Sequence, residues 1–293
     1  MKTGKGTSRD SRHQVALAAT LACVLEASAE KVGNVTPERR FADAGFRDFV
    51  ASAVALGPVI AQAGPGRVGW AVWKSVAAAR RATATNTHLG VALLFAPLVA
   101  AWRSPQRGGL RRRLAAVLRD LTVGDARWAY RAIRLAKPGG LGRSDVADVR
   151  RSPAITLRHA MALAAQRDAI ASEYVQDFAI TFDLVLPALL RGVRRGLAVP
   201  EAIAQAHLEL VARLPDTLIM RKAGRPAAEA VSARARAAVD AGGRYTRQGR
   251  RAAGRLDLSL REEGNRLNPG ASADLVAAAL FVWLLETDGS GLG

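Results

Sequence analysis

Apolar residues recur at helical spacing along most of the chain. Between residues 38 and 63, Phe46, Phe49, Val50 and Ala53 fall on one face of a helix. No stretch alternates apolar and polar residues between hairpin turns, as a half-exposed β-strand would, and no internal repeat is visible. The pattern predicts an all-α fold, a single compact domain of about ten helices.

Interruptions in this pattern place the expected helices. Approximately, these cover residues 14–30, 38–63, 68–84, 89–102, a segment ending near 121, 125–135, 152–196, 200–214, two or three segments within 225–263, and 272–286. Gly57-Pro58 and Pro187 are expected to kink or interrupt their helices. Asp125 and Ser272 stand where helix caps are expected, and Asp274 is expected in the first turn of the last helix. Residues 1–13 are predicted to form a disordered basic tail, and residues 14–288 the helical domain.

The formal net charge is +18 over 293 residues. All 43 basic residues are arginine except Lys2, Lys5, Lys31, Lys74, Lys137 and Lys222. Two explanations stay open: a high-GC coding bias, or selection for a phosphate-bearing partner, which guanidinium groups suit. Nucleic acid is one such partner, but only 5% of residues are aromatic and no zinc-finger or RNA-binding signature is present. A small polyphosphate substrate explains the charge equally well, so nucleic acid is the less favoured alternative.

The first apolar run follows a basic stretch and therefore resembles a secretion signal. Ala27-Ser28-Ala29 could be a cleavage site, but Glu26 interrupts the region before it, and the run continues as an amphipathic helix. The run from Leu89 to Trp102 contains Pro97 and is too short to cross a bilayer. We therefore expect a cytoplasmic protein with no membrane partner. Cys23 is the only cysteine, which excludes a disulfide framework.

Three polar, glycine-bearing segments separate the apolar helices. They are Lys31–Pro37, Asn86–Gly90 and Asn268–Asp274. A helical scaffold needs glycine at its turns but does not need Asn, His, Lys and Asp gathered there. The segments indicate an enzyme, with chemistry carried by loops that the helices hold in place.

Together, the motifs resemble those of the triphosphoribosyl-dephospho-CoA synthase family. The matching stretches are Lys31-Val-Gly-Asn-Val, Asn86-Thr-His-Leu-Gly and Gly270-Ala-Ser-Ala-Asp, supported by Ala129–Gly140, Arg167-Asp168…Tyr174 and Leu214–Lys222. The resemblance implies an all-helical enzyme that displaces adenine from ATP and transfers the triphosphoribosyl group to the 2′-hydroxyl of dephospho-CoA. Val32 and Asn34 depart from the family's usual Pro and Leu, and residues 36–49 lack its Asn-Gly-Ala-His and Asp-Met-Asp stretch. An alternative acceptor, a pterin or one-carbon cofactor precursor, therefore stays open.

Such a transfer builds positive charge on the ribose, so it calls for carboxylates beside the anomeric carbon and for proton transfer. We expect Glu26, Asp43 and Asp274 to be the catalytic carboxylates, with Asp43 and Asp274 also as ligands of Mg²⁺. His88 is expected to bind substrate rather than to act as an acid, and Arg167 and Asp168 could be only a surface ion pair. His13, His159, His207, Trp70 and Trp73 are expected to be structural. The remaining expected substrate contacts are Lys31, Gly33, Asn34, Asn86, Thr87, Gly90, Arg167, Asp216, Arg221, Lys222, Asn268, Gly270 and Ser272. The oligomeric state is left open.

Overall fold

The computed structural model describes residues 8–142, 146–262 and 264–287, and within them every regular element is helical. The α-helices are α1 Ser8–Ser28, α2 Phe46–Ile60, α3 Val68–Ala82, α4 Leu89–Trp102, α5 Leu110–Arg119, α6 Val123–Ala136, α7 Leu157–Ala164, α8 Ala169–Val175, α9 Leu186–Arg194, α10 Val199–Arg213, α11 Thr217–Ala223, α12 Arg225–Asp240, α13 Arg247–Arg261 and α14 Gly270–Glu286. A π-helix, η1 (Ile180–Val185), precedes α9, and a 3₁₀ turn, η2 (Gly243–Tyr245), precedes α13. The all-α class is confirmed, with fourteen α-helices in the described ranges where about ten were expected.

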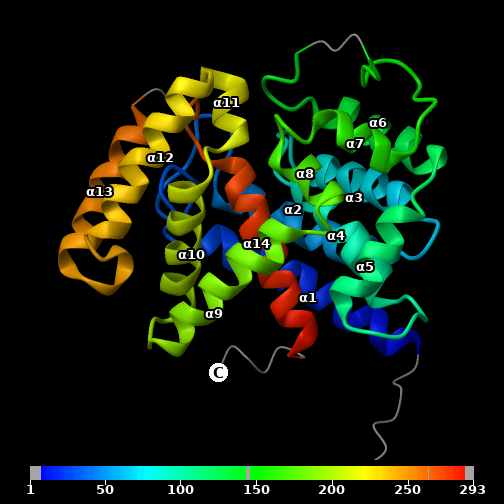
Figure 1. Cartoon of the computed structure of the whole chain (residues 1–293), viewed down its shortest axis with the longest axis horizontal. Helices are drawn as coiled ribbons and strands as arrows, with labels where there is room; N and C mark the ends of the chain where they lie inside the picture. Colours follow the sequence, from blue (N-terminus) through cyan, green and yellow to red (C-terminus); the bar gives the residue numbers. More distant parts are fainter. Residues whose placement is uncertain (1–7, 143–145, 263, 288–293) are drawn as a thin grey trace, which may run out of the picture.

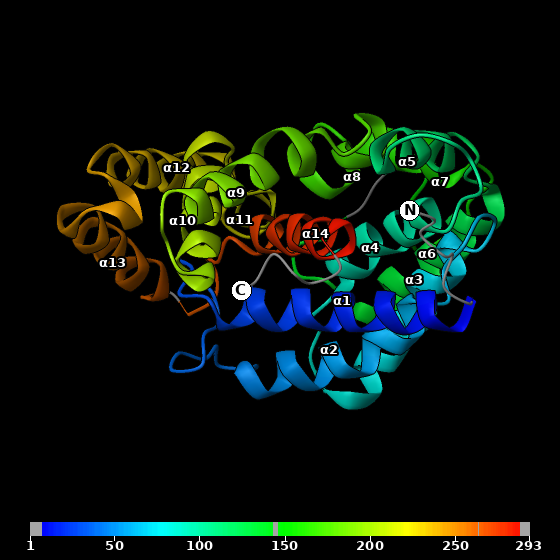
Figure 2. The same ribbon diagram turned by 90° about the horizontal axis from the view of Figure 1, so that it is seen from below.

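Helix α14 is the centre of the molecule. Figure 1 shows it between α10 on one side and α4 on the other, and in Figure 2 it lies beside α1, with α2 packed on the far side of α1. Fourteen of its 17 residues are buried, which is expected of a helix that is apolar all round. Phe281 of α14 stacks on Phe95 of α4 with ring centroids 4.2 Å apart. The two most apolar helices thus form the core against which the others pack.

A second, smaller core joins α10, α11, α12 and α13, seen at the left of Figure 1. Leu208, Ile219, Val231 and Leu256 are buried in it. Val32, from the loop after α1, packs into the same cluster. The N-terminal loop is therefore anchored to helices nearly 200 positions away in sequence.

Several boundaries differ from those expected. Helix α1 begins at Ser8, so residues 8–13 are helical rather than part of a disordered tail; residues 1–7 of that tail lie outside the described residues. Helix α2 begins at Phe46 instead of near 38 and continues through Gly57-Pro58. Helix α11 was not expected. In the described ranges, no helix is both long enough and apolar enough to span a bilayer.

The expected helix 152–196 is divided into four pieces. Asp168 caps α8 by accepting hydrogen bonds from the N–H groups of Ile170 (2.9 Å) and Ala171 (3.1 Å). Asp177 and Phe178 take left-handed backbone conformations, with φ of +50° and +59°. Asp168 therefore lies at the N-terminus of a short helix and not on the side of a long one.

Two caps were assigned to the wrong residues. The cap of α6 is Thr122, whose hydroxyl accepts from the Asp125 N–H at 3.1 Å, while the Thr122 N–H donates to Asp125 Oδ2 at 2.9 Å. Asp125 also accepts from Gly69 N at 2.8 Å and so ties α6 to α3. At α14 the cap position is Pro269, because the helix begins two residues before Ser272, so Asp274 lies beyond the first turn in which it was expected.

The tryptophan pair Trp70 and Trp73 is only partly buried, at the edge of the larger core. The Trp73 ring lies 4.8 Å from that of Trp128 on α6, and Lys74 lies 5.0 Å from the Trp73 ring centroid. The pair packs as a structural element, as expected, but on the border with solvent.

Candidate functional site

A cavity of about 720 Å³ opens between the N-terminal end of α4, the C-terminal end of α6, α7, α8, α11 and the first turns of α14. Its size is that of a small-molecule site. Segments from all three glycine-bearing motifs meet there. The predicted site residues that line it are Glu26, Asn34, Asp43, Asn86, Thr87, His88, Gly90, Arg167, Arg221, Lys222, Asn268, Gly270 and Asp274. Lys31, Gly33, Asp216 and Ser272 are not part of its lining.

Asp274 and Glu26 form an acidic wall. Asp274 is enclosed by protein but partly accessible from the cavity, and its carboxyl group makes no hydrogen bond to any residue that the structure describes. Burial raises the pKa of Asp274 well above its usual range, and the negative charges of Glu26, Asp216 and Asp168 raise it further. Burial also raises the pKa of Glu26, although Lys31 opposes this rise. Asp274 is thus a carboxyl group that retains its proton to unusually high pH.

Gly90 brings the second motif against this acid. A Cβ atom at Gly90 would lie only 2.0 Å from Oδ2 of Asp274 and 2.6 Å from Cδ1 of Ile170. Only a residue without a side chain can occupy this position without displacing the carboxylate. Gly90 is therefore explained by its contact with Asp274, more than by turn geometry.

His88 is buried on the cavity wall beside Phe49, with ring centroids 5.6 Å apart in an edge-to-face arrangement. Its Nδ1 lies 2.7 Å from the Ser52 hydroxyl, while its Nε2 has no hydrogen-bond partner in the described part of the chain. Burial lowers the pKa of His88 to about 4. The ring is therefore neutral at physiological pH, which fits binding better than acid catalysis.

A basic wall borders the same cavity. Arg221 pairs with Asp168, and Lys222 donates to Asn268 Oδ1 at 2.8 Å and to the Asn265 carbonyl at 3.0 Å. The sequence left open a surface ion pair of Asp168 with Arg167; Asp168 instead pairs with Arg221 and joins α8 to α11 at the cavity wall. Arg167 is exposed and lines the cavity. Together these groups offer positive charge to an anionic ligand.

Asp43 is exposed, at the rim of the cavity. Its Oδ1 accepts from the Asn265 amide at 3.3 Å. Burial lowers the pKa of Lys222, and the negative charge of Asp43 opposes this shift. Among the described residues, no group of three or more His, Cys, Asp or Glu is arranged to hold a metal ion.

Lys31 does not reach the cavity. It is 1% exposed, forms an ion pair with Glu26 (Nζ to Oε1, 3.1 Å), and donates to the carbonyls of Glu26 and Ala29. This arrangement gives no support to the expected contact of Lys31 with phosphate, since its ammonium group is held by Glu26 and by backbone carbonyls outside the cavity lining. The side chain satisfies the buried end of α1 instead.

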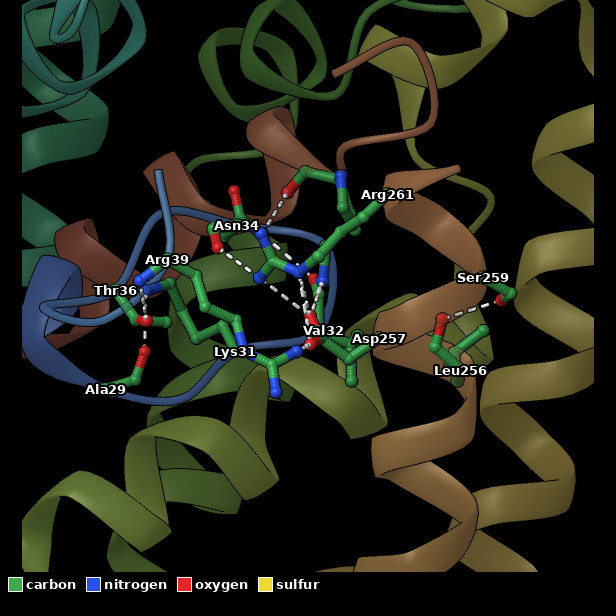
Figure 3. A network of polar contacts seen from close by, with 12 residues as sticks. Ala29, Lys31, Val32, Asn34, Thr36, Arg39, Leu256, Asp257, Ser259 and Arg261 are labelled. Atoms are coloured by element: carbon green, nitrogen blue, oxygen red, sulfur yellow. Dashed lines mark hydrogen bonds and ion pairs between the residues drawn. The ribbon is translucent and has the colours of Figure 1, made fainter. Parts of the chain in front are cut away.

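Gly33 and Asn34 are held by α13 and by the turn before α14. Gly33 has a φ of +68° and donates its N–H to Asp257 Oδ1 at 2.7 Å, so this N–H is already engaged and gives no support to the expected substrate contact. Arg261 donates to the Asn34 carbonyl at 2.6 Å, as Figure 3 shows. Of this loop, Asn34 lines the cavity, with its Nδ2 3.3 Å from His207 Nε2. His207 is fully buried, in keeping with the structural role expected of it.

Asp216 and Ser272 also have a different role from the one expected. Asp216 caps α11 through Leu218 N (2.8 Å) and Ile219 N (3.1 Å), and its other oxygen accepts from Ser272 N (2.7 Å) and Ser272 Oγ (2.8 Å). All four bonds saturate a carboxylate that is 3% exposed. The pair joins α11 to α14 and offers nothing to a ligand.

Several lining residues were missed in the sequence: Arg80, Tyr130, Lys137, Asp148 and Asn265. Tyr130 and Lys137 lie within the stretch Ala129–Gly140 that carried the resemblance, so a signal for them existed. Lys137 ends α6 with a φ of +50°, and a Cβ at Gly140 would meet the Arg221 carbonyl at 2.8 Å. This loop therefore packs directly onto the basic wall. Nothing local distinguishes Arg80 or Asn265.

The fold and the cavity define a class: an all-helical protein with a small-molecule site that has an acidic wall and a basic wall. The particular family follows from comparison. The chain belongs to the ATP:dephospho-CoA triphosphoribosyl transferase family, whose model matches residues 12–291.

Individual relatives agree with this assignment. A Pseudomonas fluorescens (strain Pf-5) protein named "Probable 2-(5''-triphosphoribosyl)-3'-dephosphocoenzyme-A synthase" is 37% identical over 115 residues, 39% of each chain. The Klebsiella pneumoniae 2-(5''-triphosphoribosyl)-3'-dephosphocoenzyme-A synthase is 34% identical over 99 residues, 34% of this chain and 35% of its own. The matches thus span well under half the length of these curated relatives.

A solved structure covers more of the chain. A crystal structure from Archaeoglobus fulgidus, assigned as a triphosphoribosyl-dephospho-CoA synthase, superposes with a TM-score of 0.63 at 26% identity, covering 81% of this chain and 98% of that one. None of these three relatives is named for a pterin or for nucleic-acid binding, so the pterin acceptor and the nucleic-acid alternative gain no support.

Proposed function

We propose that the protein displaces adenine from ATP and transfers the triphosphoribosyl group to the 2′-hydroxyl of 3′-dephospho-CoA. The observation that carries the proposal is the position of Asp274, a protonatable carboxyl group beside Glu26, in one cavity with Arg167, Arg221 and Lys222. Family membership names this reaction. The cavity offers the two kinds of group that it needs, carboxyl groups for the sugar and cations for the phosphates.

The two acids have different environments and therefore different roles. Lys31 favours the ionised form of Glu26, which stabilises the positive charge that develops at the anomeric carbon. Asp274 holds a proton that passes to the departing adenine, and its carboxylate then accepts the proton of the attacking 2′-hydroxyl. The bond between C1′ of the ATP ribose and N9 of adenine breaks, and a bond forms between C1′ and the 2′-oxygen of dephospho-CoA. Asp274 gives one proton to adenine and takes one from the hydroxyl group, so the protons balance.

Magnesium fits this site only together with the nucleotide. No protein cage is present in the described ranges, but Mg²⁺ commonly uses one or two carboxylates and takes its remaining ligands from phosphate and water. Asp43 offers such a carboxylate, because only its Oδ1 is engaged by Asn265. Bound there, the ion would neutralise part of the triphosphate charge, while Arg167 and Lys222 orient the chain of phosphates.

Adenine release tests the proposal. Purified protein with ATP, Mg²⁺ and 3′-dephospho-CoA should release adenine and yield an acceptor heavier by one triphosphoribosyl unit, measured by liquid chromatography and mass spectrometry. Asp274→Asn should lower the rate by at least about 100-fold. Glu229→Gln is the matched control, because Glu229 is exposed on α12 away from the cavity. Folded wild-type protein that releases no adenine would contradict the proposal.

A further inference from the structure

Ser52 contacts two residues of the Asn86–Gly90 motif, Thr87 and His88, from behind the cavity lining. It lies on α2, is fully buried and does not line the cavity. Its hydroxyl oxygen lies 2.7 Å from Nδ1 of His88 and 2.6 Å from the hydroxyl oxygen of Thr87. The Thr87 oxygen is itself 3.1 Å from His88 Nδ1. The three side chains form a closed triangle, and nothing in the sequence singles out Ser52 as a part of it.

The two hydroxyl hydrogens of this triangle bear on the state of the imidazole ring. The acceptors within the triangle are the two hydroxyl oxygens and His88 Nδ1, and neither hydroxyl bonds to any other acceptor in the described residues. If Thr87 donates to Ser52, then Ser52 donates to Nδ1; if Thr87 donates to Nδ1, Ser52 donates to Thr87. Nδ1 accepts in both arrangements. Nδ1 could donate only if the Thr87 hydroxyl turned out of the triangle into the cavity that Thr87 lines, so the arrangements that keep both hydroxyls paired place the hydrogen of the neutral ring on Nε2.

This Nε2–H group is buried without a partner among the described residues. An unsatisfied buried donor is costly, and it becomes a favourable contact when a ligand supplies the acceptor. His88 belongs to the lining of the cavity in which we place ATP, and since its Nε2 is covered in this structure, a nucleotide reaches it only when a neighbouring side chain moves slightly. A nucleotide brings phosphate oxygens and ring nitrogens, all of them acceptors.

We propose that Ser52 is a positioning residue that holds His88 as the Nε2–H tautomer, so that His88 meets the nucleotide as a neutral hydrogen-bond donor. The nucleotide part of this inference rests on the proposed function; the tautomer part does not. The low pKa of His88 agrees with a ring that stays neutral throughout. His88 contributes affinity and orientation, while the proton transfers belong to Asp274.

Nitrogen NMR of the ligand-free protein tests the tautomer directly. In ¹⁵N-labelled wild type at pH 7.5, the His88 signals, assigned by their loss in His88→Asn, should show an unprotonated Nδ1 and a protonated Nε2. In Ser52→Ala, Thr87 alone remains to hold the ring, and the fraction with hydrogen on Nδ1 should rise. Ser52→Cys keeps a weak donor and should lie between the two. A wild-type His88 with hydrogen on Nδ1 would overturn the inference, even if Ser52→Ala does not fold.

Kinetics test the link to the nucleotide. Ser52→Ala should raise the KM for ATP by about tenfold with a smaller change in kcat, the effect expected when one donor is misdirected. Ser75→Ala is the matched control, since Ser75 is also fully buried, and its hydroxyl has no partner in the described chain. An equal KM increase in both variants would reduce Ser52 to a packing residue. If wild-type protein released no adenine, the proposed function would fail, while the NMR result would still decide the tautomer.

Discussion

Lys31 Nζ lies 3.1 Å from Glu26 Oε1, and both side chains are buried. Of the two, only Glu26 reaches the cavity. The loop after α1 therefore contributes to the site through the acid that its lysine supports. A cation at this position stabilises an ionised carboxylate that burial alone would neutralise.

Removing this lysine should destabilise the fold in a pH-dependent way. Lys31→Met leaves a buried carboxylate unpaired, which costs about 3 to 5 kcal/mol near pH 8. The pKa of Glu26 is already raised by burial and rises further without Lys31. The loss should therefore be small near the ordinary glutamate pKa and should grow as the pH rises through the folded-state value.

Urea unfolding at pH 5 and pH 8 measures this difference. Arg225→Met is the control, because the Arg225–Glu229 pair is 3.7 Å long and exposed; it should change the free energy of unfolding by no more than about 0.5 kcal/mol. A Lys31→Met loss below about 1 kcal/mol at pH 8 would show that the ion pair does not support Glu26.

Asp274→Asn should stabilise the protein while it abolishes activity. The folded-state pKa of Asp274 is raised, so stability from its neutral form is present at low pH and is lost as the pH rises through that value. Asparagine cannot ionise and does not incur this loss. The melting temperature of the variant should exceed that of wild type at pH 8 and approach it at pH 4. Asp183→Asn, an exposed change, should show no such trend; the same trend in both would refute the burial argument.

The helices were predictable where one local feature decides them. Helix α4 has the bounds expected for it, because 14 apolar residues stand between two polar segments. Within 152–196, the change expected near Pro187 had a local signal, whereas the breaks at 165–168 and 176–179 were not predictable, since they depend on distant or buried partners. Asp168 caps α8 and also pairs with Arg221, 53 positions away, while Glu173 accepts hydrogen bonds from Ile180 N and Thr181 N at 3.0 and 2.8 Å.

Dependence on distant partners also explains why some of the predicted site residues line the cavity and others do not. The sequence identified the loops, but it could not tell which polar side chains turn inward to satisfy buried backbone groups. Lys31 and Asp216 both do so, with partners at the end of α1 and at Ser272. Asn34 and Asp274 face the cavity. Residue type and spacing are alike in the two groups, and only tertiary packing separates them.

His207→Gln should make the free energy of unfolding depend less on pH below about pH 6.5. Burial lowers the pKa of His207 to about 3, so between about pH 6.5 and that value the unfolded chain binds a proton that the folded chain excludes. Wild type should lose roughly 1.4 kcal/mol per pH unit from this group within the window. The variant costs stability at pH 8, because Asn34 and Pro269 lose a buried neighbour, but its deficit should shrink as the pH falls to 4. His159→Gln, an exposed change on α7, is the matched control; the same shrinking deficit in that variant would contradict the burial argument.

Gly90→Ala should damage activity more than stability. The added Cβ would lie 2.0 Å from Oδ2 of Asp274, so the carboxylate must rotate away from its place on the cavity wall. Because a displacement of about 1 Å in a catalytic group can lower a rate about 100-fold, adenine release should fall by at least about 10-fold. Gly254→Ala is the control: this glycine lies exposed in α13 with open space around its Cα, and the change should raise stability by about 0.5 to 1 kcal/mol with the rate unchanged. Full activity in a folded Gly90→Ala protein would show that the position of Asp274 does not govern the reaction.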